Sequence, residues 1–113
     1  MINKIKNKQA VVDTSATKNK YLEKIMDCVM ALLGEEEVSI GLFGSIVVGK
    51  ARRGSDVDVA IIPHGGWKKW KLSLLRERLE NLNVPYKVEL VDFSEVSDRF
   101  RKHALENVVW WKN

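Results

Sequence analysis

Cysteine, histidine and proline are scarce in this 113-residue sequence, which contains one cysteine, two histidines and two prolines. The single thiol, Cys28, excludes an internal disulfide, and we expect it to be a core residue. One cysteine and two histidines do not provide the ligand spacing of a zinc site. No apolar run approaches the ~18 residues that a membrane span requires, and no signal-peptide-type stretch follows the first lysines. The sequence therefore predicts a soluble, cytoplasmic protein without a membrane partner.

Excess charge of one sign is absent from most of the chain. The net charge of +4 arises among the first 20 residues, which carry five lysines and one aspartate, so the remainder is balanced. The length allows one domain. We predict a flexible basic N-terminal arm at residues 1–17 and a single domain at residues 18–113. Because the arm has no aromatic residue for base stacking, nucleic acid is not expected to be the main partner.

Apolar spacing predicts helices that alternate with strands. Residues 22–33 and 67–82 carry apolar side chains at the three-and-four spacing of a helix face, and Gly34 stands where the first helix would end. Ser94 or Ser97 can cap a further short helix. Strands are predicted at residues 38–43, 56–62, 86–91 and 108–111. We interpret the acidic run 35–37 as a solvated connection. This order predicts an α/β fold in which helices back a small mixed β-sheet.

A glycine–serine pair closes the first predicted strand. Gly44 and Ser45 have no side chain larger than a hydroxymethyl group, so a phosphate can approach the backbone there. Free N–H groups at the start of a following helix would bind that phosphate. We therefore interpret Gly44 and Ser45 as a phosphate-binding turn.

Two aspartates, Asp56 and Asp58, stand in the second predicted strand, with ten residues between Ser45 and Asp56. Side chains two positions apart on a strand project from the same face, and Val57 and Val59 take the other. Neighbouring carboxylates repel each other unless a cation joins them, and oxygen ligands of this kind suit Mg²⁺. The pair predicts a magnesium site that substrate phosphates would complete.

A third carboxylate would hold a second Mg²⁺ ion, and Glu89 is the leading candidate. It lies in the third predicted strand on the same face as Val91, whereas Val88 and Leu90 face the opposite way. Asp92 is off that face. The predicted catalytic and metal-binding residues are Asp56, Asp58 and Glu89, and the predicted nucleotide-binding residues are Gly44 and Ser45.

A P-loop is a competing interpretation of the same segment. The run from Gly44 through Gly49 and Lys50 to Ala51 is one residue short of a Walker A sequence. Ala51 replaces the hydroxyl-bearing residue that would ligate Mg²⁺, and a P-loop leaves the aspartate pair unexplained. We therefore favour the carboxylate site.

Other charged and aromatic residues have two interpretations each. Lys50, Arg52 and Arg53 can assist the phosphates or form a solvated loop, and His64 is interpreted as a turn residue rather than a general base. The four tryptophans can pack in the core or form an interface. They are Trp67, Trp70, Trp110 and Trp111.

Gly44-Ser45, ten intervening residues and Asp56-x-Asp58 together resemble the minimal nucleotidyltransferases of the DNA polymerase β superfamily. The resemblance covers residues 38–93 by motif. It implies a mixed sheet backed by helices and transfer of a nucleoside monophosphate, with two Mg²⁺ ions, to an acceptor hydroxyl. Gly44 and Ser45 would bind the triphosphate, and both aspartates would hold both metals. Glu89 stands where the family usually has aspartate and reaches one methylene further.

The resemblance also implies a partner, because stand-alone members of that family pair with small helical HEPN-type proteins, in several cases as antitoxins. We therefore expect the antitoxin of a toxin–antitoxin system, which moves AMP from ATP to a hydroxyl of its HEPN-type partner. The alternative is a weak or inactive nucleotidyltransferase-fold module that acts by partner contact, and a third hypothesis is a nucleic-acid accessory protein that uses its basic arm. The base preference, the acceptor and any pairing of two chains stay open.

Overall fold

A four-stranded sheet with the order β3-β2-β1-β4 forms the centre of the computed structural model, which describes residues 19–49 and 56–113. The predicted arm at residues 1–17 lies outside the described residues. In chain order the elements are α1 (Lys20–Leu33), β1 (Val38–Phe43), β2 (Asp56–Pro63), α2 (Lys71–Glu80), β3 (Lys87–Asp92), the 3₁₀ helix η3 (Phe93–Glu95), α3 (Asp98–Ala104) and β4 (Val109–Lys112).

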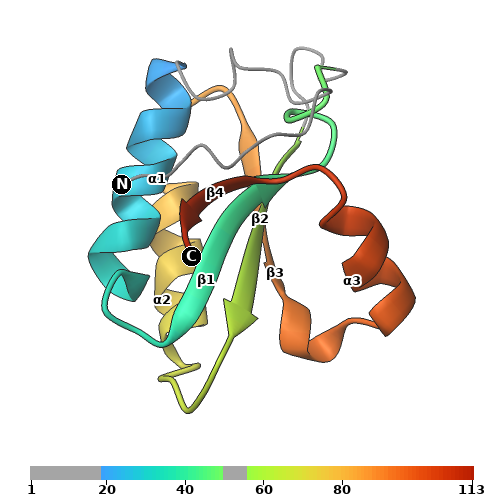
Figure 1. Ribbon diagram of the computed structural model, residues 1–113. Helices are drawn as coiled ribbons and strands as arrows, with labels where there is room; N and C mark the ends of the chain where they lie inside the picture. Colours follow the sequence, from blue (N-terminus) through green and yellow to red (C-terminus); the bar gives the residue numbers. More distant parts are fainter. Residues whose placement is uncertain (1–18, 50–55) are drawn as a thin grey trace.

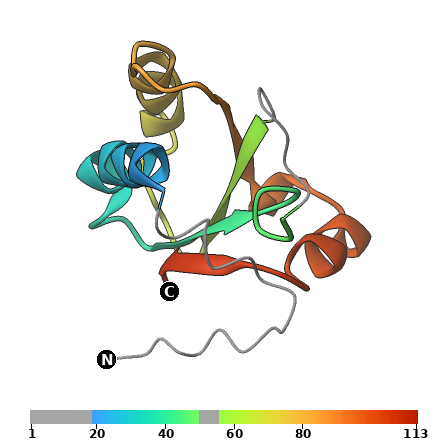
Figure 2. The same ribbon diagram turned by 90° about the horizontal axis from the view of Figure 1, so that it is seen from above.

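The sheet is mixed, as the alternation of helices and strands predicts. β1 is antiparallel to both β2 and β4, whereas β2 and β3 are parallel. A parallel pair requires a crossover, and α2 supplies it. Figures 1 and 2 show α1 and α2 on one face of the sheet and α3 on the other. The predicted fold class is confirmed.

Each face of the sheet has its own apolar cluster. The larger cluster lies under α1 and α2, where the three β2 residues Val57, Val59 and Ile61 are fully buried. The smaller one lies on the α3 face and contains Phe43, Ala60, Ile62 and Phe93. Because β2 is buried on both faces beyond its first residues, any polar side chain on it must lie near the start of the strand.

α2 starts later than the apolar spacing predicts, at Lys71 instead of residue 67. Trp70, at the N-cap position, provides no side-chain hydrogen bond. The chain before it is held to another element, because the Lys68 N–H donates to Glu36 Oε1 at 3.0 Å. Lys71 Nζ lies 2.7 Å from Glu36 Oε2. The predicted solvated connection is therefore wrong for Glu36, whose side chain is only 11% exposed and anchors the start of α2.

No helix in the two described stretches is long and apolar enough to cross a membrane.

Candidate active site

The predicted phosphate-binding turn begins at Gly44, directly after β1. Gly44 has φ +85°, a conformation that side-chain-bearing residues rarely adopt. A Cβ built on it would overlap Asp58 Oδ2 and lie 3.2 Å from the carboxyl carbon of Asp58. Glycine is therefore required here both for the backbone angle and for the close approach of the aspartate. The described part of the segment, residues 44–49, forms hydrogen-bonded turns instead of the predicted helix start, with the Val47 N–H donating to the Gly44 carbonyl at 3.0 Å.

Asp56 and Asp58 lie at the start of β2, beside that turn. Asp58 pairs in register with Phe43 of β1 on one side and with Glu89 of β3 on the other. Asp56 is exposed and pairs with Lys87, while Asp58 is half-buried. Asp58 and Glu89 are partners on neighbouring strands about 4.8 Å apart, and Gly44, which follows β1, approaches Asp58 from the other side, so the three residues form a row.

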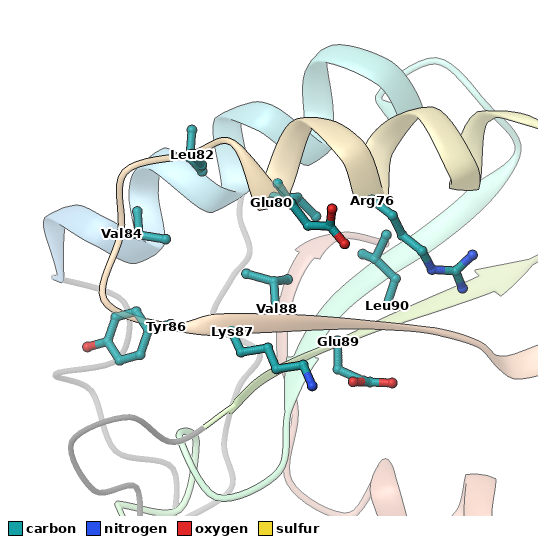
Figure 3. A pocket seen from close by; sticks show the side chains of 10 residues that line it. Arg76, Glu80, Leu82, Val84, Tyr86, Lys87, Val88, Glu89 and Leu90 are labelled. Carbon is teal, nitrogen blue, oxygen red and sulfur yellow. The ribbon is translucent and has the colours of Figure 1, made fainter.

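Glu89 lies on the face of β3 that the sequence predicts. Figure 3 shows its side chain on the opposite side of the strand from Val88 and Leu90, which point toward α2. Leu90 is buried and Val88 packs against the larger core cluster, whereas Val91 packs against the cluster on the α3 face. Glu89 and Asp58 therefore project from the same face of the sheet.

The electrostatics of the row are unfavourable in the absence of a cation. Burial, together with the smaller effect of the negative charges of Asp56 and Glu89, raises the pKa of Asp58 to about 6. No salt bridge to any of these three acids occurs among residues 19–49 and 56–113. Concentrated negative charge with no salt-bridge partner among the described residues is typical of a cation site.

The fit to Mg²⁺ is that of a two-carboxylate site. In the described portions of the chain, no group of three or more His, Cys, Asp and Glu side chains could hold a metal ion as placed. Mg²⁺ commonly takes only one or two protein carboxylates and completes its shell with phosphate oxygens and water. Asp56 and Asp58 fit that donor set, and the assignment of Glu89 as a metal ligand stays a prediction.

Of four further candidate residues, His64 alone lies in the described part of the chain. Lys50, Arg52 and Arg53 fall outside the described residues. His64 follows β2 at the end of the strand opposite Asp56, and its Nε2 is hydrogen-bonded to Ser39 Oγ. That position makes it a turn residue, as predicted, and separates it from the acids.

Asp92 is also distant from the row, at the far end of β3. It caps η3 by accepting from the Ser94 N–H at 2.9 Å, and Lys69 Nζ lies 3.2 Å from its Oδ2. Burial opposes ionisation of Asp92, but the hydrogen bonds from Ser94 and the Lys69 ammonium outweigh it and lower its pKa. Asp92 is therefore a structural residue.

A hollow beside the Gly44 turn was not predicted from the sequence. It has a volume of about 300 Å³ and opens between residues 43–48 and α3. Among its lining residues are Phe100 and His103 of α3 and Asn107. The only sequence signal is an apolar residue at position 100 in a helix too short to show periodicity.

A comparison of the chain with known protein families gives a match over the segment that contains the candidate site. Residues 34–111 match the family described as polymerase beta, nucleotidyltransferase. The chain belongs to this nucleotidyltransferase family. The match includes Gly44, Ser45, Asp56, Asp58 and Glu89.

One curated relative of this nucleotidyltransferase is named "Probable protein adenylyltransferase MntA", from Haemophilus influenzae. The two are 33% identical over 66 residues, which is 58% of each chain. The match thus spans less than two thirds of the relative's length.

Solved structures share the fold of this nucleotidyltransferase. A toxin–antitoxin structure with AMP-PNP matches 80% of this chain and 73% of its own, with a TM-score of 0.63 and 23% identity. A complex of a tri-AMPylated Shewanella oneidensis HEPN toxin with an MNT antitoxin matches 83% of this chain and 71% of its own, with a TM-score of 0.56 and 20% identity.

Proposed function

We propose that this protein is a Mg²⁺-dependent protein adenylyltransferase that acts as the antitoxin of a HEPN-type toxin. The row of Gly44, Asp58 and Glu89 carries the proposal, because it brings a phosphate-accessible turn against a cluster of carboxylates. The name of the H. influenzae relative supports ATP as substrate and a protein as acceptor. The solved complexes support a HEPN-type partner. A cytoplasmic location, where ATP and Mg²⁺ are available, fits this reaction.

Each residue of the candidate site has a defined task in this proposal. Gly44 and Ser45 bind the triphosphate through backbone N–H groups and the Ser45 hydroxyl. Asp56 and Asp58 hold Mg²⁺, and Glu89 takes the third acidic position, nearest the acceptor. When bound, Mg²⁺ would neutralise phosphate charge and lower the pKa of an acceptor hydroxyl.

The reaction exchanges one bond at the α-phosphorus for another. The acceptor oxygen forms a bond to the α-phosphorus, the bond from that phosphorus to the bridging oxygen breaks, and pyrophosphate leaves with the electron pair. The hydroxyl proton passes to solvent. Because acceptor and leaving group stand on opposite sides of the phosphorus, the row orients the substrate with pyrophosphate toward Gly44 and the acceptor toward Glu89.

The test is transfer of label from α-labelled ATP to the co-expressed HEPN-type partner in the presence of Mg²⁺. The proposal expects labelled partner with the wild-type protein and none with Asp56→Ala. Co-purification of that variant with the partner is the control, because it separates loss of chemistry from loss of binding. Unlabelled partner in both samples refutes the enzymatic function.

A binding module of low activity is the second candidate, and the position of Glu89 favours it. The three acids do not form a ready three-ligand group within the described stretches, and glutamate stands where the family usually has aspartate. Glu89→Asp separates the candidates. A large gain in turnover supports the weakened enzyme, whereas full turnover in the wild-type protein excludes it.

A further inference from the structure

Two hollows in the described part of the chain border the row of Gly44, Asp58 and Glu89, one at Glu89 and the other at Gly44, and they lie on opposite sides of the sheet. The larger, about 420 Å³, runs between α2 and β3 and is lined by Val88 and Leu90 (Figure 3). These side chains face away from Asp58. The smaller, which we name the α3 cavity, is lined by Phe43, Gly44, Ser45, Val48, Phe100, His103, Ala104, Glu106 and Asn107. Of these two hollows in the described part of the chain, the α3 cavity is the one that includes the phosphate-binding turn.

Phe100 forms an aromatic wall of the α3 cavity, and two buried aromatic rings pack against it. The Phe100 ring packs edge-on against Phe43, with centroids 6.2 Å apart and an interplanar angle of 84°. It also contacts Phe93, with centroids 5.8 Å apart. Phe43 and Phe93 are themselves buried and stack edge-to-face at 5.5 Å. These contacts hold Phe100 in place without covering it.

Phe100 is exposed to a degree that packing does not require. It is 41% exposed, and Trp70 is the single other large hydrophobic side chain so exposed in the described stretches. α3 is anchored at this point, because Ser97 caps its start and Arg101 Nη2 donates to the Phe93 carbonyl at 2.9 Å. The helix thus presents a rigid, open ring next to Gly44 and Ser45. Such a ring is the platform on which a flat heteroaromatic ligand stacks.

The volume and the lining of the α3 cavity limit the kind of ligand that it can hold. About 300 Å³ is the lower end of the range for small-molecule sites, so the α3 cavity holds one ring system and not an entire nucleotide. Beyond Gly44 and Ser45 its walls are apolar at Phe43, Val48 and Ala104, which favours a flat ring over pyrophosphate as the occupant of that part. Three polar side chains, His103, Glu106 and Asn107, also line the cavity and provide donors and acceptors for the edge of a base.

We propose that the α3 cavity seats the base of the nucleoside triphosphate, stacked on Phe100, while Gly44 and Ser45 hold its phosphates. This inference rests on the proposed function. The acceptor is assigned to the other side, because Glu89 lies across Asp58 from Gly44 and belongs to β3, an edge strand of the sheet. Base and acceptor thereby reach the α-phosphate from different directions.

The test compares two ligands that share phosphates but not a base. Binding of α,β-methylene-ATP, which cannot lose pyrophosphate, and of inorganic tripolyphosphate is measured by calorimetry with Mg²⁺ for the full-length protein. Phe100→Ala is expected to weaken binding of the nucleotide by about 5- to 150-fold, the range for removing one base–aromatic stack. Tripolyphosphate binding is expected to stay within twofold, and Phe100→Trp to retain nucleotide binding. Trp70→Ala, at the other exposed aromatic, is the matched control and should change neither.

The remaining outcomes overturn the inference in distinguishable ways. Unchanged nucleotide affinity in Phe100→Ala rejects the α3 cavity as the base site, and if the KM for the acceptor protein rises instead, the cavity takes an acceptor side chain. Equal weakening of both ligands assigns Phe100 a structural role. A wild-type protein that binds neither ligand refutes the proposed function itself, and the base site with it.

Discussion

Replacement of Asp58 by asparagine is expected to stabilise the metal-free protein at neutral pH. The Asp58 carboxyl has its pKa raised from 3.8 to about 6 by burial and by Asp56 and Glu89. Between these two pH values the folded state binds more protons than the unfolded state, so the free energy of unfolding falls as pH rises. Above pH 6 the folded wild-type protein carries the full penalty of the ionised carboxylate, and Asp58→Asn does not.

The expected gain follows from the size of that shift. A change from 3.8 to about 6 corresponds to about 3 kcal/mol at 1.36 kcal/mol per pH unit. The carboxyl is only partly buried, so solvent screens a large share of the repulsion, and we expect ~1.5 kcal/mol. Below pH 3.8 the carboxyl is protonated in both states, and this contribution disappears.

Urea unfolding at pH 7.5 and pH 3.5, with a chelator present, measures the effect. The free energy of unfolding of Asp58→Asn should exceed that of the wild type at pH 7.5 and match it at pH 3.5. Asp27→Asn, an exposed substitution on α1, is the matched control and should be neutral at both values. Added Mg²⁺ should stabilise the wild type and not Asp58→Asn, because a ligand of the native state alone raises its stability. A loss of stability in Asp58→Asn at pH 7.5, or the same difference at both pH values, would contradict charge repulsion at Asp58 as the cause.

Three further substitutions test other parts of the structure. Gly44→Ala should lower the free energy of unfolding by about 1 to 3 kcal/mol in urea titrations, because alanine is strained at φ +85° and its Cβ meets Asp58. Gly66→Ala is the control, because a Cβ there meets nothing within 4 Å, and it should lower the free energy of unfolding far less. Asp92→Ala should lower it by about 1 to 2 kcal/mol at pH 7 by removing the cap of η3. Since the pKa of Asp92 is lowered in the folded state, that loss should shrink as pH falls below 3.8, and a loss independent of pH contradicts the role of its charge. Glu89→Asp should raise turnover in the α-labelled ATP assay if the extra methylene weakens the site, while a drop shows that glutamate is the fitted residue.

The shared face of the three acids could be predicted from the sequence, because the alternation of side chains along a strand depends only on neighbouring residues. A two-residue period on β2 and β3 puts Asp56, Asp58 and Glu89 on one face, and the structure confirms that arrangement through the burial of Val57 and Leu90 on the other. The parallel pairing of β2 with β3 then brings Asp58 and Glu89 into register. That pairing was expected only as part of a mixed sheet, since the register of non-local strands is set by packing.

Features that depend on non-local contacts were not predictable. The start of α2 is delayed because Glu36, 35 residues earlier, binds Lys71 and the Lys68 N–H. Apolar spacing cannot reveal such an anchor. Similarly, the α3 cavity requires Phe100 to meet Phe43, a contact between residues far apart in the chain.

Transfer of label from α-labelled ATP to the co-expressed HEPN-type partner is the decisive measurement of adenylyltransferase activity. We expect Mg²⁺-dependent labelling of the partner by the wild-type protein, and no labelling by Asp56→Ala although that variant still co-purifies with the partner. A partner that stays unlabelled, or that is labelled equally by wild type and Asp56→Ala, would contradict this activity.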